Sequence, residues 1–223
     1  MTAADADGDR PTFSRRLREA TSAAHAEAEG GDLMTRLVRG TLPVAGFTAL
    51  TGQLYLVYEA LEATAGALRR DPTASDVHPF LDPALERRDA LAADLTALAG
   101  PEGLHRLRPL PATERYTDHL RALRGEWPGL FLAHHYTRYL GDLSGGLAIG
   151  AIAARTYGLT PDHGVAFSTF VGVPSPKRYK DAYRARLDDL PWDGAQRQLV
   201  IDETVRAYRF NTAVLAELSM IDW

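Results

Sequence analysis

The segment Tyr139–Gly146, with the sequence YLGDLSGG, decides how this chain folds. It lies inside a proline-free run, residues 129–160, that is rich in residues typical of helices. Gly141, Gly145 and Gly146 fall within six positions, and each glycine inside a helix costs roughly 0.5–1 kcal/mol relative to alanine. The segment therefore predicts a helix that bends, or one that is approached closely by a second helix or by a flat ligand.

Helical patterns also run through the other parts of the chain. Apolar residues recur at intervals of three and four between Phe47 and Leu68, and again between Ile201 and Leu215. Strand-like alternation is weak, and no linker or repeat divides the sequence. We therefore predict an all-α fold with one domain over residues 12–223 and a flexible tail at residues 1–11. Further helices are expected at about 13–29, 33–38, 84–99, 112–125, 130–157 and 176–187.

The composition excludes several classes of protein and site. Of the 223 residues, 45% are hydrophobic and 24% are charged, as in ordinary globular domains. The net charge of -4 gives no basic surface for nucleic acid. Cysteine is absent, which excludes disulfides, thiolate metal ligands and a cysteine nucleophile. Neither a signal peptide nor a long apolar run is recognisable, so we expect a cytoplasmic protein without a membrane anchor.

His25 is the first candidate metal ligand. It follows Thr21 by four residues and Leu17 by eight, which places it on the apolar face of the first helix. Glu29, one turn later, could hydrogen-bond one ring nitrogen and leave the other nitrogen for a metal. Such pairs are also common on helices that bind nothing, so the spacing alone leaves both interpretations open.

Two charged pairs are equally ambiguous when taken alone. Arg138 and Asp142 are four residues apart and could form a surface ion pair, or the carboxylate could order water beside a ligand. Lys180 and Arg184 share one face of a later helix beside Asp181, which is typical of a solvated basic surface.

Taken together, several motifs resemble heme oxygenases of the bacterial and animal type. They are YTRYLGDLSGG with AHHY just upstream, ATSAAHAEAE, YLVYEALE and YKDAYRARL, and their order and separation match over residues 12–218. The resemblance implies a helical fold with heme b sandwiched between a proximal helix and a kinked distal helix. It also implies cleavage of heme to biliverdin, expected as the α-isomer, with carbon monoxide and ferrous iron. Dioxygen is consumed, and an external ferredoxin or flavoprotein reductase supplies the electrons.

The resemblance gives the two sides of the heme their residues. His25 matches the proximal iron ligand, and Glu29 matches its hydrogen-bond partner. Gly141 and Gly145 match the glycines that let the distal helix lie directly over the heme, and Gly146 adjoins them in the same motif.

The same resemblance implies a polar network on the distal side. Asp142 matches the carboxylate that holds water near the iron-bound ligand, and Tyr58 and Arg138 match the residues that anchor this network. Phe210 and Asn211 match part of the last-helix wall of the heme pocket.

The heme propionates are expected to meet cations. Lys180 and Arg184 match residues that grip them, and Tyr136 matches a tyrosine that reaches one propionate. Arg18 stands where the family commonly has lysine, so the charge is kept but the geometry changes. Leu147 stands where a glutamine is expected, which removes a polar group from the outer part of the site.

Two other functions fit parts of the sequence. One is a heme-binding or heme-sensing protein of the same fold without turnover, although binding alone does not require Asp142. The other is a non-heme enzyme, either a di-iron oxidase or a thiaminase-like hydrolase. A di-iron oxidase requires paired Glu-x-x-His motifs, and this chain has none. The hydrolase usually requires a cysteine nucleophile, and this chain has no cysteine. His134 and His135 are adjacent and point about 100° apart on a helix, so no histidine besides His25 is expected to bind metal.

Overall fold

The computed structural model describes residues 11–223, and most of the predicted tail (residues 1–10) lies outside this range. Over the described part the chain is helical and forms no β-strand, as predicted. None of these helices is long and apolar enough to cross a membrane. The helices are α1 (Phe13–Gly30), α2 (Asp32–Val38), α3 (Val44–Leu68), α4 (Arg88–Ala99), α5 (Gly103–Arg106), α6 (Pro111–Ala122), α7 (Pro128–Gly141), α8 (Leu147–Tyr157), α9 (Pro176–Asp188) and α10 (Gly194–Ser219), with short turns η1 (Pro72–Ala74), η2 (His78–Phe80), η3 (Pro83–Leu85), η4 (Leu123–Gly125), η5 (Asp142–Gly146) and η6 (Ala166–Ser168).

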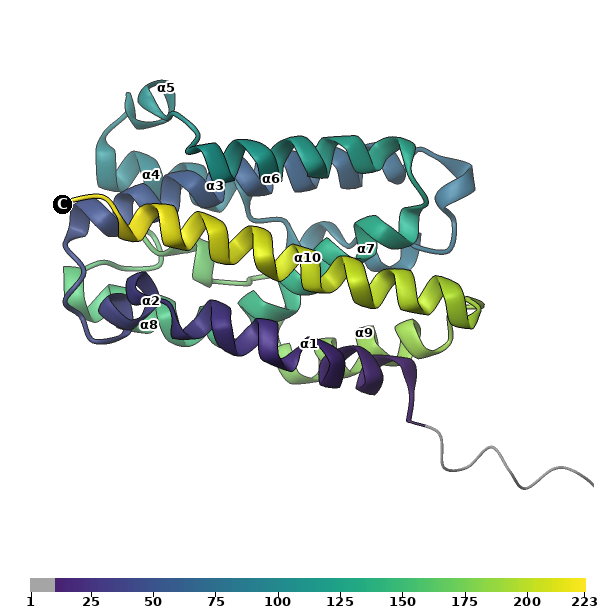
Figure 1. The fold of residues 1–223 in the computed structure, drawn as a ribbon. Coiled ribbons are helices and arrows are strands. Elements are labelled where there is room, and N and C mark those ends of the chain that lie inside the picture. Colours follow the sequence, from purple (N-terminus) through teal and green to yellow (C-terminus); the bar gives the residue numbers. More distant parts are fainter. Residues whose placement is uncertain (1–10) are drawn as a thin grey trace, which may run out of the picture.

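Helix α10 is the central packing element of the fold. It crosses the whole face of the molecule in Figure 1, with α1 on one side and α6 on the other. It packs against α7, α1 and α6, while α3 packs against α4 and α6. Leu17 of α1, Leu61 of α3 and Phe131 of α7 are fully buried in the core that these contacts enclose. The apolar faces predicted from the spacing are therefore the faces that meet in the core.

The predicted bend lies at η5, which is a π-helical turn between α7 and α8. A π-helical turn interrupts the regular i to i−4 hydrogen bonds, and such turns are a recognised cause of kinks at functional sites. Ser144 contributes because its hydroxyl donates to the carbonyl oxygen of Leu140 at 2.7 Å. The backbone of Gly141 and Gly146 keeps ordinary helical angles, with φ of −62° and −58°. The glycines are therefore not required here for an unusual backbone conformation.

One predicted helix begins later than its sequence indicates. The residues after Pro83 form the short turn η3, and α4 starts only at Arg88. Glu86 is extended, and the buried carboxylate of Glu62 accepts the backbone N–H groups of Arg87 at 2.5 Å and Arg88 at 3.0 Å. A side chain from α3 thus satisfies the free N–H groups at the start of α4 and fixes where the helix begins.

Candidate active site

A largely apolar cavity of about 250 Å³ lies between α1 and the bend that joins α7 to α8. Helices α3 and α10 and the loop around η6 form its other walls. Leu50, Leu54 and Ile149 are among its apolar lining residues. A mostly apolar slot with a few polar groups at its ends is typical of a site for a flat organic ligand.

The bend presents bare backbone to this cavity. Gly141 and Gly145 both line it, and a Cβ atom added at either position would meet no atom within 4 Å. Close packing against another helix therefore does not explain these two glycines. Gly150, one turn into α8, is different, because a Cβ there would lie 2.2 Å from Ser168. Gly141 and Gly145 keep space open, whereas Gly150 permits close contact with η6.

On the α1 side, the structure brings the predicted pair His25 and Glu29 together at the cavity. Nδ1 of His25 lies 3.4 Å from Oε2 of Glu29, and both residues line the cavity. The His25 side chain is 45% exposed, and the Tyr208 ring packs edge-on against it with 5.5 Å between the ring centroids. Because Glu29 occupies Nδ1, the other ring nitrogen, Nε2, is available as a metal ligand.

A buried hydrogen-bond chain lies on the opposite side of the cavity. Arg138 Nη1 donates to Asn211 Oδ1 at 2.6 Å, and its Nε donates to the Tyr58 hydroxyl at 3.2 Å. The Tyr58 hydroxyl in turn donates to Oδ2 of Asp142. The direction of the chain is forced, because a guanidinium has only donors and leaves the single proton of Tyr58 for the carboxylate. The chain leaves Oδ1 of Asp142 free of these contacts at the cavity wall.

Burial dominates the acid–base properties of this chain. It raises the pKa of Asp142, while the charge of Arg138 and the hydrogen bond from Tyr58 act in the opposite direction. It also raises the pKa of Tyr58 well above its ordinary value, so this phenol keeps its proton. The predicted distal residues Tyr58, Arg138 and Asp142 therefore form one connected unit, in place of a surface ion pair.

The predicted anion-binding residues lie on α9, α1 and α7, and none of them lines the cavity. Lys180 Nζ donates to the Ser144 hydroxyl at 2.8 Å and so reaches the cavity wall. Arg184 Nη1 lies 3.5 Å from Asp181 Oδ1, and the buried Nε of Arg184 has no hydrogen-bond partner among the described residues. Tyr136 is 7% exposed, whereas Arg18 lies on the surface of α1.

On α10 only Asn211, one of the two residues that the resemblance implies, lines the cavity. Phe210 does not line the cavity; its ring stacks on Tyr116 with 4.9 Å between the ring centroids. Tyr208 and Asn211 line the cavity, together with Leu215. Their spacing of three and four residues identifies the face of α10 that meets the cavity, and Phe210 lies off this face. Leu147, the other departure from the family pattern, is 36% exposed at the start of α8.

Asp94 is a cavity residue that the sequence analysis missed. It lies on α4, is 2% exposed, and accepts the backbone N–H groups of Ala166 at 2.7 Å and Phe167 at 2.8 Å. Burial raises its pKa, and these two hydrogen bonds act against that rise. The Phe167 ring packs edge-on against Tyr58 with 5.4 Å between centroids, so Asp94 positions the wall behind the distal tyrosine. Its place between Leu91 and Leu95, in an apolar stripe, was the available signal.

We expect Asp94→Ala to loosen the η6 wall. The substitution leaves two N–H groups of η6 without an acceptor, which costs about 1–3 kcal/mol for each group. The free energy of unfolding should fall by this amount, and amide exchange at Ala166 and Phe167 should accelerate. Asp94→Asn, which keeps one acceptor oxygen, should recover part of the loss. Asp89→Ala on the exposed face of α4 is the matched control and should change stability by less than about 0.5 kcal/mol. Unchanged exchange in Asp94→Ala would exclude the anchoring role.

Comparison with known proteins agrees with this geometry. The sequence model for heme oxygenase matches residues 11–217. Heme oxygenase 1 of Homo sapiens is 35% identical over 207 residues, covering 92% of this chain and 71% of the human protein. Heme oxygenase 2 of Synechocystis is 34% identical over 209 residues, with 92% and 82% of the two chains covered.

A solved structure supports the same fold. The crystal structure of heme oxygenase-1 from Synechocystis in complex with heme superimposes with a TM-score of 0.86 at 32% identity, over 93% of this chain and 92% of that one. The all-α prediction is thus confirmed, and the chain belongs to the heme oxygenase family.

Proposed function

We propose that the cavity between α1 and η5 is where this heme oxygenase binds heme b and cleaves it to biliverdin, carbon monoxide and ferrous iron. One observation carries the assignment: His25 and Glu29 of α1 line the same cavity as Gly141 and Gly145, which lie at the bend formed by the end of α7 and η5. A nitrogen ligand and an open backbone surface are what a flat iron porphyrin requires, so the residues present fit the group.

On the proximal side, His25 would hold the iron through Nε2, and Glu29 would keep the ring tautomer fixed through Nδ1. Heme supplies both the iron at which dioxygen is activated and the carbon atom that is oxidised. The backbone of Gly141 and Gly145 would then cover the opposite face, where side chains would crowd a small iron ligand. Tyr208, packed against His25, would limit rotation of the imidazole.

On the distal side, the chain Arg138–Tyr58–Asp142 would control protons. Because Tyr58 already donates to Oδ2, the second oxygen of Asp142 can accept a hydrogen bond from water at the cavity wall. A carboxylate with a raised pKa can accept and return a proton through such water. Arg138 and Asn211 would keep Tyr58 in the donor orientation, so that the carboxylate does not turn away.

Cations beside the cavity would set the orientation of the heme. Lys180 and Arg184 would bind the propionates from α9, Arg18 would add charge from α1, and Tyr136 would contribute its hydroxyl. The buried Nε of Arg184, which lacks a partner among the described residues, is one donor ready for an anion. By holding the propionates, these residues would determine which meso carbon of heme is oxidised, and we expect the α-isomer. Phe210 would affect heme only through the packing of α10.

Electrons would come from a ferredoxin or a flavoprotein reductase. Helix α9 carries a basic cluster, of which Lys177 is 87% exposed, that could attract an acidic donor. The cluster consists of Lys177, Arg178, Lys180, Arg184 and Arg186. The rate of reduction by an acidic ferredoxin should fall as ionic strength rises, because exposed charges are screened over about 10 Å at 0.1 M salt. A rate independent of salt would contradict this docking surface. A cytoplasmic location remains an expectation from the sequence.

Absorption spectroscopy tests the proposed function directly. The heme-free protein is titrated with hemin, and the complex is then followed in air with a reductant and catalase. A saturable Soret band that decays while a biliverdin band grows supports the proposal. A stable Soret band with the cognate electron donor present would indicate heme binding without turnover, and no Soret band would overturn the heme site.

Two variants separate the roles of the two sides. His25→Ala should alter the Soret band, and added imidazole should restore that band. His105→Ala, on the exposed helix α5, should leave the Soret band unchanged.

Asp142→Asn should retain hemin binding but lose biliverdin formation, with the exposed Asp118→Asn as its control. Biliverdin formation at the normal rate in Asp142→Asn would exclude the proposed proton role.

We expect Gly145→Leu to affect heme binding and stability in different ways. Its side chain enters open space, so the heme-free protein should gain up to about 1 kcal/mol in the free energy of unfolding, because glycine disfavours helix. The same side chain occupies the heme position, so the hemin affinity should fall at least about tenfold. Gly125→Ala, which is also unobstructed but lies in η4, is the matched control for the effect on affinity. Retained hemin affinity in Gly145→Leu would contradict the location of the heme.

A further inference from the structure

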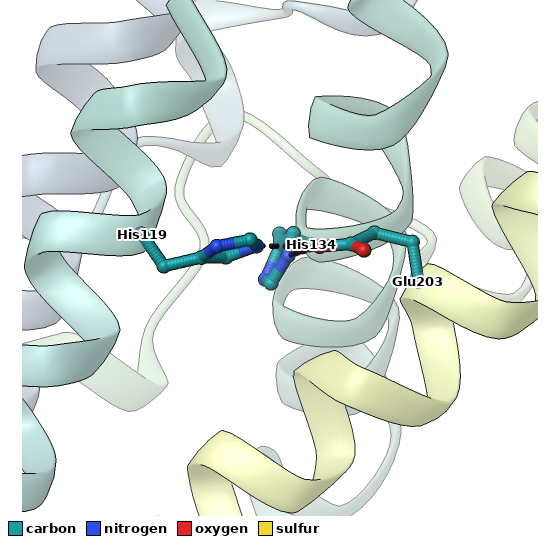
Figure 2. A group of neighbouring side chains, drawn as sticks. All are labelled: His119, His134 and Glu203. Carbon is teal, nitrogen blue, oxygen red and sulfur yellow. Dashed lines mark hydrogen bonds and ion pairs between the residues drawn. The ribbon is translucent and has the colours of Figure 1, made fainter. Parts of the chain in front are cut away.

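A second polar cluster lies away from the cavity and has no part in the heme site. It consists of His119 from α6, His134 from α7 and Glu203 from α10, and none of the three lines the cavity. Figure 2 shows the three side chains pointing toward one another from their separate helices. The Nε2 atoms of both histidines approach the same oxygen, Glu203 Oε1, at 2.5 Å for His119 and 2.8 Å for His134.

The cluster carries the charge that a divalent cation requires. The Glu203 side chain is 8% exposed, and its Oε1 accepts a hydrogen bond from each of the two histidines. The His134 side chain is fully buried between this carboxylate and the Tyr116 hydroxyl. The nearest cation is Arg206, whose Nη1 lies 3.4 Å from the other oxygen of Glu203, and its side chain is 59% exposed and able to move into solvent. The buried carboxylate of Glu203 is therefore compensated by only one exposed cation beside the two imidazole rings.

We propose that His119, His134 and Glu203 form a binding site for a divalent first-row transition cation of the zinc or ferrous type. The ligands are Nε2 of each histidine and Oε1 of Glu203, which lie within 4.8 Å of one another. Two imidazole nitrogens and one carboxylate oxygen favour zinc, iron or cobalt over magnesium or calcium. This site is separate from the heme iron and does not depend on the proposed function.

Only small movements are needed to admit the ion. Metal–ligand bonds of about 2.0–2.2 Å in a tetrahedron separate neighbouring ligands by about 3.3 Å. Given their present separations of 2.5 Å and 2.8 Å, the histidine nitrogens would move about 0.5–0.8 Å away from Glu203 Oε1. The two nitrogens, which lie within 4.8 Å of each other, would settle at about 3.3 Å. His119 is 19% exposed, so its side of the cluster gives a path for the ion and room for water as a fourth ligand.

The residue beside His134 supports its change of tautomer. To bind metal, Nε2 must lose its hydrogen while Nδ1 gains one, and the neutral ring as a whole releases no proton. His134 Nδ1 lies 3.3 Å from the Tyr116 hydroxyl, which can donate to this nitrogen without metal and accept from it with metal. Such a partner on the remote ring nitrogen is the usual means of orienting a metal-binding histidine.

Calorimetric titration of the full-length, heme-free protein with Zn²⁺ tests the proposal. We expect one site per chain in the wild type, retained in His105→Ala and in His25→Ala, which remove an exposed histidine and the cavity histidine. His119→Gln should weaken the site by more than the roughly 10–100-fold expected for loss of an outer-shell partner. Absence of a site in the wild type, or equal affinity in His119→Gln and His105→Ala, would overturn the proposal.

A spectroscopic arm needs no variant. Co²⁺ in this site should give the intense visible bands of a four- or five-coordinate ion, and a weak octahedral spectrum would count against the proposed site.

Far-UV circular dichroism and a hemin titration of His119→Gln report whether the fold and the cavity are intact. Loss of Zn²⁺ binding with hemin binding retained supports a distinct site, and failure of the heme site alone leaves the Zn²⁺ result unaffected.

Discussion

Side chains above the plane of heme would fill the space that a small iron ligand needs, so one face of heme has to be covered by backbone. This constraint governs the arrangement around η5. Gly141 and Gly145 remove the side chains that would fill the space, and the π-helical turn bends the helix across it. Together these glycines cost the helix about 1–2 kcal/mol, which is a sizeable share of the stability of a typical domain. Such a cost persists where an occupant of the cavity offsets it, since a ligand that binds only the folded state stabilises that state.

The cavity wall formed by α4 and η6 is held in place by buried carboxylates. Asp94 fixes the backbone of η6, and Glu62 fixes the start of α4, which carries Asp94. Arg87 completes this arrangement, because it donates to the carbonyl oxygen of Thr169 at 2.7 Å and stacks 4.0 Å from the centre of the Phe170 ring. Loops carry no regular backbone hydrogen bonds, so a loop that forms part of a binding site needs such side-chain acceptors and donors.

The sequence was sufficient for the helices and for the groups whose partners are close in the chain. Periodicity located the apolar faces, and the spacing of four residues placed Glu29 beside His25. The identity of the fold rested on motifs, because periodicity alone does not distinguish one helical arrangement from another. Phe210 shows the limit, since its neighbour Asn211 faces the cavity and a shift of one residue turns a side chain by about 100°.

Contacts between distant segments could not be predicted from spacing, and the link of Tyr58 to Arg138 and Asp142 was implied only by the family resemblance. Asp94 meets η6 across more than seventy residues, and nothing local marks Ala166 or Phe167 as its partners. The cluster of His119, His134 and Glu203 is hidden for the same reason, because each residue belongs to a different helix. In the sequence His134 can be compared only with the adjacent His135, and the structure confirms that these two side chains diverge to different partners.

The polar residues of α7 explain how the glycine-rich turn η5 is held in a single position at the cavity. Inward-facing groups on this helix meet partners on other helices: His134 meets Glu203 of α10, and His135 meets Tyr183 of α9 at 3.0 Å. Arg138, one turn after His134, meets Tyr58 and Asn211. Sliding or rotating α7 by one residue would leave all these buried groups unsatisfied, at about 1–3 kcal/mol each. The position of α7 along its axis and its rotation about that axis are therefore fixed before the chain reaches Gly141. The position of η5 consequently depends on contacts made by α7.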